Sequence, residues 1–149
     1  MEKLSSFLTV LLLSVVSFAQ PQAPDTLWTR TFGGSNSDDG FSIRQTIDGG
    51  YIITGFTNSY GAGAWDIYLL KCDMVGDLQW YNTFGGTNND CGQCVQQTND
   101  GGYIIAGYTY SYGAGGKDIY LIKTDSLGNQ EWYRTFGGNG YLVIANLYS

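Results

Sequence analysis

Carboxylate and aromatic side chains are the groups in this sequence whose types and spacing could do chemistry. Asp38 and Asp39 are adjacent, and Glu131 is the one glutamate after residue 20. Hydrolysis of a glycosidic bond needs two carboxyl groups about 5–9.5 Å apart, one of them with a raised pKa. Nothing in the sequence around Asp38 or Asp39 predicts burial, and Glu131 adjoins a tryptophan of a repeated motif. We therefore expect no catalytic residue and no enzyme activity.

Aromatic residues lie in two glycine-rich stretches, 58–66 and 110–118, and acids and amides lie in the loop 33–40 and at 88–90. Aromatic rings can stack on sugar rings, carboxylates and amides can bond hydroxyl groups, and loops on a rigid scaffold often carry function. We expect a face that binds a glycan or protein ligand. The candidate ligand-binding residues are Asp38, Asp39, Tyr60, Trp65, Asp90 and Tyr112. The alternative is structural: the two aspartates Asp38 and Asp90 cap turns, and the two tyrosines cover the junction between sheets.

Cys91 and Cys94 form a C-x-x-C motif, which can be a redox pair or half of a metal site. A redox pair of the thioredoxin kind needs a helix start, and a zinc site needs two further ligands, whereas Cys72 is the one other cysteine. We therefore expect no metal site. The pair could instead close a local disulfide after export.

The charge and composition exclude several classes of function. The formal net charge is −6, whereas nucleic acids and anionic membranes recruit clustered Lys and Arg. The sequence holds no histidine, which removes Ser-His-Asp and Cys-His catalysis. The 22 glycines and the 15% of aromatic residues are typical of a turn-rich all-β protein. We expect no nucleic-acid partner and no cofactor.

A sequence repeat of 52 residues decides the expected architecture. Trp28, Trp80 and Trp132 share this spacing, as do the TFGG runs that follow them, and DGGYII occurs at 48–53 and 100–105. Each unit predicts four strands, which in the first unit are 41–46, 51–57, 67–71 and 78–84. A strand that is apolar on both sides, such as 51–57, must lie between neighbouring sheets. The unit repeats because each sheet is the packing partner of the next.

The connections of each unit are expected to fall at two ends of its sheet. The tight turns 48–50 and 73–77, each with a glycine for positive φ, fall at one end. The longer loops 33–40 and 58–66 fall at the other end. We expect the candidate ligand-binding residues to gather at the end with the longer loops.

The order of these motifs resembles the blade repeats of secreted bacterial β-propeller proteins. The matching pattern is WxxTFGG, DxG, DGGYIIxGxT, SYGAG and DIYLxKxDxxGxxxW, and it covers residues 28–138. Its last part is also similar to blades of quinoprotein-like propellers, but the matching positions are turn and packing positions, so no quinone-binding residue carries over. The resemblance implies export and an incomplete propeller, with two four-stranded antiparallel blades and a partial third.

The two ends of the chain carry further expectations. Residues 1–19 contain a lysine, an apolar run and small residues before an expected cleavage site, which predicts a signal peptide and secretion. We expect no membrane span after the signal peptide is removed. Residues 20–27 are expected to be a linker, 28–79 and 80–131 two blade repeats, and 132–149 a truncated third. A ring needs more blades, which would come from a longer parent chain or from head-to-tail association of copies.

These observations favour an exported binding or scaffolding module at the cell surface or outside the cell. The rival interpretation is a fragment of a larger propeller hydrolase or lyase whose catalytic residues lie outside this chain.

Overall fold

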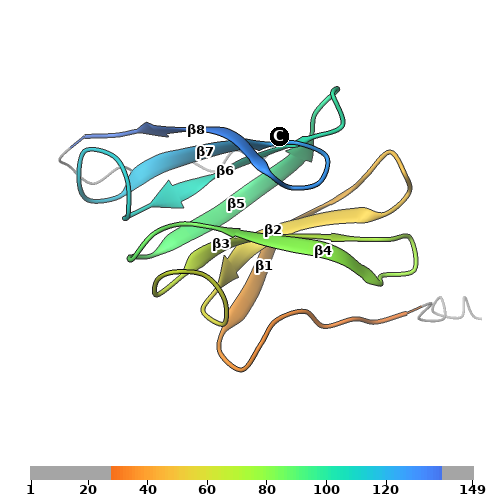
Figure 1. Cartoon of the computed structure of the whole chain (residues 1–149). Coiled ribbons are helices and arrows are strands. Elements are labelled where there is room, and N and C mark those ends of the chain that lie inside the picture. Colours follow the sequence, from red (N-terminus) through yellow and green to blue (C-terminus); the bar gives the residue numbers. More distant parts are fainter. Residues whose placement is uncertain (1–27, 139–149) are drawn as a thin grey trace, which may run out of the picture.

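The computed structural model describes residues 28–138, which form two four-stranded antiparallel sheets and no helix (Figure 1). The first sheet consists of β1 (Asp38–Gln45), β2 (Tyr51–Thr57), β3 (Asp66–Cys72) and β4 (Leu78–Phe84). The second consists of β5 (Asp90–Gln97), β6 (Tyr103–Thr109), β7 (Asp118–Thr124) and β8 (Gln130–Phe136). The predicted all-β fold with four strands per sheet is confirmed. The expected signal peptide 1–19, linker 20–27 and tail 139–149 lie outside the described residues.

The strand bounds follow the predicted pattern, with one clear difference at β1. β2 and β4 have the predicted bounds, but β1 begins at Asp38, three residues before the predicted start. The reason is a β-bulge between Gly40 and Ser42, across which the ladder continues to the pair of Asp38 with Thr57. The bulge interrupts the regular alternation of side chains along β1. No helix among the described residues is long and apolar enough to cross a membrane.

The two sheets pack face to face and share one apolar core. From the first sheet the core takes Ile52, Ile67 and Leu69. From the second it takes Val95, Tyr103, Ile105, Tyr120 and Ile122, and Trp80 and Phe84 pack against it. This packing places a sheet over one side of β2, whereas the sequence predicted a neighbouring sheet on both sides of the strand.

Tight turns close the end of the sheets opposite the longer loops. The β1–β2 turn has Gly49 at φ +83° and a hydrogen bond from Thr46 N to Gly50 O. The β3–β4 turn has Gly76 at φ +80°. Both glycines take the positive φ that the sequence predicted for these turns.

Residues 28–37 precede β1 and run along the side of the first sheet that faces away from the second (Figure 1). The sheets are therefore offset from the sequence units 28–79 and 80–131: Trp80, which opens the second unit, belongs to β4 of the first sheet.

Candidate functional site

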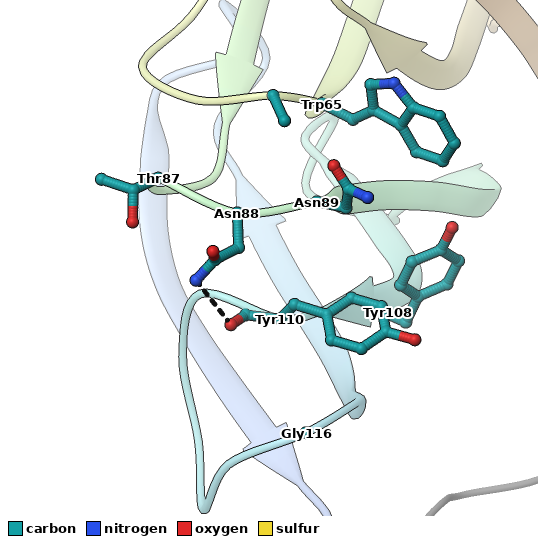
Figure 2. Close-up of a pocket in the computed structure, with 8 residues that line it drawn as sticks. Trp65, Thr87, Asn88, Asn89, Tyr108, Tyr110 and Gly116 are labelled. Atoms are coloured by element: carbon teal, nitrogen blue, oxygen red, sulfur yellow. Dashed lines mark hydrogen bonds between the residues drawn. The ribbon is translucent and has the colours of Figure 1, made fainter.

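A cleft of about 560 Å³ opens where the longer loops of the two sheets meet. The β2–β3 loop, the β4–β5 connection, the end of β6 and the β6–β7 loop surround it. Its lining residues are Ala64, Trp65, Thr87, Asn88, Asn89, Tyr108, Tyr110 and Gly116. Figure 2 shows Asn89 between Trp65 on one side and Tyr108 and Tyr110 on the other. The cleft combines aromatic rings with side-chain amides and hydroxyls.

Contacts with both sheets hold Trp65 in position. Its ring stacks on Phe56 of β2, with ring centroids 4.5 Å apart and planes 20° apart. Its carbonyl accepts a hydrogen bond of 2.7 Å from the backbone N–H of Asp90. It also forms a parallel β-bridge with Asn89. The indole is therefore fixed at the junction between the sheets, where a ligand could meet it.

The corresponding position in the second sheet carries a cation over an aromatic ring. Lys117 stands 52 residues after Trp65, and Tyr108 stands 52 residues after Phe56. Lys117 Nζ lies 3.8 Å from the centroid of the Tyr108 ring, a cation–π contact. Burial raises the pKa of Tyr108 to about 12. The Tyr108 hydroxyl is therefore protonated at neutral pH and can donate a hydrogen bond.

Asn88 and Asn89 give the cleft its amide groups. The backbone N–H of Asn88 donates to Ser111 Oγ at 3.1 Å, and its Nδ2 donates to the Tyr110 carbonyl at 3.1 Å (Figure 2). These bonds fix the side chain of Asn88. Among the described residues, Asn88 Oδ1 and the side-chain amide of Asn89 have no hydrogen-bond partner. They can therefore bond a ligand without breaking a contact of the fold.

Asp66 holds the β2–β3 loop in the form that places Trp65. Asp66 Oδ2 accepts hydrogen bonds from the backbone N–H groups of Ala62 at 2.9 Å and Gly63 at 3.1 Å. Burial raises the pKa of the Asp66 carboxyl, and the neighbouring charge of Asp90 adds to the effect. This buried carboxylate is a structural clamp of the loop.

Asp38 and Asp90, two predicted ligand-binding residues, each use carboxylate oxygen Oδ2 to hold loops of the fold together. Asp90 is 0% exposed, and its Oδ2 accepts hydrogen bonds from Gly86 N at 2.8 Å and Ser111 Oγ at 2.6 Å. Asp38 makes the corresponding bonds in the first sheet. Each carboxylate ties the loop before its own strand to the loop after the neighbouring strand. This geometry matches the structural alternative for these residues.

Tyr60 and Tyr112 also make contacts within the fold. Tyr112 donates a hydrogen bond of 2.7 Å to the Gly85 carbonyl, and its ring lies 5.7 Å from that of Tyr120. Tyr60 donates to the Gly33 carbonyl at 3.0 Å in the same manner. Asp39 is exposed on β1 and does not line the cleft. Of the six predicted binding residues, Trp65 is the one that lines the cleft.

Sequence reasoning missed Thr87, Tyr108 and Tyr110 as cleft residues. A signal for the two tyrosines lay in the differences between the units. Tyr108 replaces Phe56 of the first unit, and Tyr110 replaces Asn58. Both replacements add an aromatic hydroxyl at the loop end of β6, while the adjacent Gly107, Thr109 and Ser111 match their counterparts in the first unit.

The cysteines of the C-x-x-C motif flank the β-bulge of β5 as free thiols, Cys91 buried and Cys94 exposed. Burial raises the pKa of Cys91, which lowers its thiolate fraction and its reactivity. The disulfide between them stays a prediction. Within residues 28–138, no three His, Cys, Asp or Glu side chains gather as a metal-binding group.

No protein-family model matches the sequence, and no curated protein matches it either. The function is therefore argued from the cleft and its chemistry.

Proposed function

We propose that this chain is part of an exported β-propeller and serves as a glycan-binding module outside the cell. Two features support the propeller: the sheets share one strand order, and they stack face to face as propeller blades do. Export is supported by the signal-peptide pattern of residues 1–19.

The aromatic and amide lining of the cleft is the observation that carries the binding proposal. The rings of Trp65, Tyr108 and Tyr110 offer flat apolar surfaces to the C–H face of a sugar. Asn88 Oδ1 and the side-chain amide of Asn89, which have no partner among the described residues, suit sugar hydroxyls, because these both donate and accept hydrogen bonds. The net charge of −6 disfavours sulfated or uronic-acid glycans through like-charge repulsion, so neutral sugars are the expected ligands.

An array of immobilised oligosaccharides, probed at neutral pH with and without calcium, tests this function. We expect the protein to bind neutral glycans. Trp65→Ala and Tyr110→Ala should each weaken binding about tenfold, the loss expected for one stacking contact of about 1.4 kcal/mol. The matched control is Trp132→Ala, since Trp132 is a 39%-exposed tryptophan of β8 that does not line the cleft.

Circular dichroism of each variant separates a lost contact from a lost fold. An array without a bound glycan, or binding that both cleft variants leave unchanged, would contradict the proposal. Turnover of a bound sugar would favour the rival interpretation, a fragment of a propeller hydrolase or lyase.

A further inference from the structure

Residues 28–34 pack on the first sheet in the same way that residues 80–86 pack on the second sheet. Residues 80–86 comprise most of β4 and the two glycines that follow it. The ring of Trp28 meets that of Tyr51 with centroids 5.8 Å apart at 62°. The ring of Trp80 meets that of Tyr103 with centroids 5.8 Å apart at 60°. The segment thus occupies the place of the fourth strand of a sheet that would precede the first.

The hydrogen bonds of this segment repeat as well. Gly34 N donates to Asp38 Oδ2 at 2.8 Å, and Gly86 N donates to Asp90 Oδ2 at 2.8 Å. Yet residues 28–34 pair with no strand of the described chain, whereas β4 is paired with β3 along its length. The segment is therefore held through side chains and a few bonds, without a β-ladder.

The end of the second sheet has nearly the same sequence as this segment. Residues 28–34 read WTRTFGG and residues 132–138 read WYRTFGG, so they differ only at Thr29 and Tyr133. Residues 132–136 belong to β8, which is hydrogen-bonded to β7. Either segment can therefore make the contacts that Trp28 makes on the first sheet, but only residues 132–138 bring a whole sheet with them.

The side of the first sheet that faces away from the second is called its free face, because no described sheet covers it, and it repeats the face that the second sheet buries in the core. Ile43 is 52% exposed, whereas Val95, its counterpart 52 residues later, is 0% exposed. Ile53 is half-buried on the same free face, and its counterpart Ile105 is buried in the core. The first sheet thus presents an apolar surface of the kind that packs on another such sheet.

The free face of the second sheet, the side that faces away from the first, repeats the face of the first sheet that is buried in the core. Ile119 and Leu121 are half-buried on β7, whereas their counterparts Ile67 and Leu69 are buried in the core. The two free faces of the chain are therefore copies of the two faces that meet inside it. Surfaces that differ and match in this way support head-to-tail contacts between identical chains.

We propose that a second copy of this chain docks head to tail, with the free face of its β5–β8 sheet on the free face of the β1–β4 sheet. In this docking, residues 132–138 of one copy displace residues 28–34 of the next, because both segments fit the same place and β8 is anchored to its sheet. In this exchange, Trp132 of one copy takes over the contacts that Trp28 makes in the next copy. The burial of Ile43 and Leu121 is then the net gain that drives association.

A native cysteine makes the contact testable. Ser42 Oγ accepts a hydrogen bond of 3.4 Å from Val95 N across the interface between the sheets. The counterpart of Ser42 is the exposed Cys94, and the counterpart of Val95 is Ile43. In the docked copies, Cys94 of one chain therefore lies against Ile43 of the next. Ile43→Cys should give a disulfide between copies under mild oxidation, seen as covalent multimers on a non-reducing gel.

The matched control is Ile47→Cys, which places an 87%-exposed thiol on the β1–β2 turn, away from the free face. One chain does not link positions 43 and 94 internally, because Ile43 pairs with Ile53 and Cys94 with Ala106 on the two outward-facing sides of the sheets, and side chains that point apart cannot close a disulfide. The double variant Ile43→Cys/Cys94→Ser should lose the multimers.

A second variant tests the displacement. Trp28→Ala loosens residues 28–34 and should raise the yield of cross-linked Ile43→Cys multimers severalfold. Multimers no more abundant than in the Ile47→Cys control, multimers that persist without Cys94, or a yield that Trp28→Ala leaves unchanged would overturn the proposal.

Discussion

At the residue scale, aspartates fasten the turns and the buried lysines of this fold. Lys71 is 4% exposed, and its Nζ lies 2.9 Å from Asp48 Oδ2 at the β1–β2 turn. Lys123 and Asp100 form the corresponding pair in the second sheet, also at 2.9 Å. A buried ammonium group without its carboxylate partner is costly. The two ion pairs therefore hold the turns in place only while Asp48 and Asp100 are ionised.

The pKa of Asp48 makes the stability of the fold depend on pH. The Thr46 hydroxyl and then the Lys71 ammonium lower the pKa of Asp48 from 3.8 to about 2. A carboxyl group whose pKa is lower in the folded state stabilises the fold above its unfolded pKa, and this contribution is lost as the pH falls through the folded pKa. We expect the free energy of unfolding to fall between about pH 4 and pH 2. Guanidinium unfolding across this range measures the fall, which Asp48→Asn should reduce.

The control for the pH dependence is Asp39→Asn. Among the described residues the Asp39 carboxylate accepts no hydrogen bond, and it is exposed. This variant should keep the full loss of stability in acid. An equal acid loss in the wild type and in Asp48→Asn would show that the contact with Lys71 does not stabilise the fold.

At the element scale, a glycine in the middle of β2 permits the bulge of β1. A Cβ on Gly55 would lie 1.7 Å from the Asp39 carbonyl oxygen. Gly107 of β6 faces the Cys91 carbonyl of β5 in the same way, at 1.9 Å. The obstacle is backbone in both sheets, so a rotamer change cannot relieve it. The bulge and the glycine therefore depend on each other.

Gly55→Ala should cost at least about 2 kcal/mol of the free energy of unfolding, because β1 must shift away from β2. The control is Gly138→Ala, where a Cβ would meet no atom of residues 28–138 within 4 Å. It should change stability by less than about 0.5 kcal/mol. Chemical denaturation of both variants measures the difference, and similar stabilities would mean that the bulge is easily rearranged.

The strands were predictable from the sequence, whereas most of the cleft was not. Runs rich in β-branched and aromatic residues, bounded by glycine turns, define β2 and β4 without reference to the rest of the chain. The roles of Asp38 and Asp90 depend on hydrogen bonds to loops about 20 residues away, which spacing alone does not reveal. Tyr110 joins the cleft because the β4–β5 connection brings Asn88 beside it. Such contacts are set by how the sheets stack.

At the scale of the whole molecule, the contribution of a residue to stability depends on whether another sheet covers its side of the sheet. It depends less on the position of the residue within its repeat unit. Leu69 and Leu121 are the same residue type at corresponding positions of β3 and β7. Leu69 is 0% exposed in the core between the sheets, and Leu121 is half-buried on the free face of the second sheet. The two residues therefore differ only in whether a neighbouring sheet covers them.

This difference predicts unequal costs for one substitution. Leu69→Ala should lower the free energy of unfolding by about 2–5 kcal/mol, since it removes buried methyl groups and leaves a cavity. Leu121→Ala should cost about 1 kcal/mol or less at protein concentrations where the chain is monomeric, because solvent already reaches that face. Denaturant unfolding at low concentration compares them. Equal costs would mean that the free face of the second sheet is already covered in the single chain, and the stacking of the two sheets would then not explain why the core lies between them.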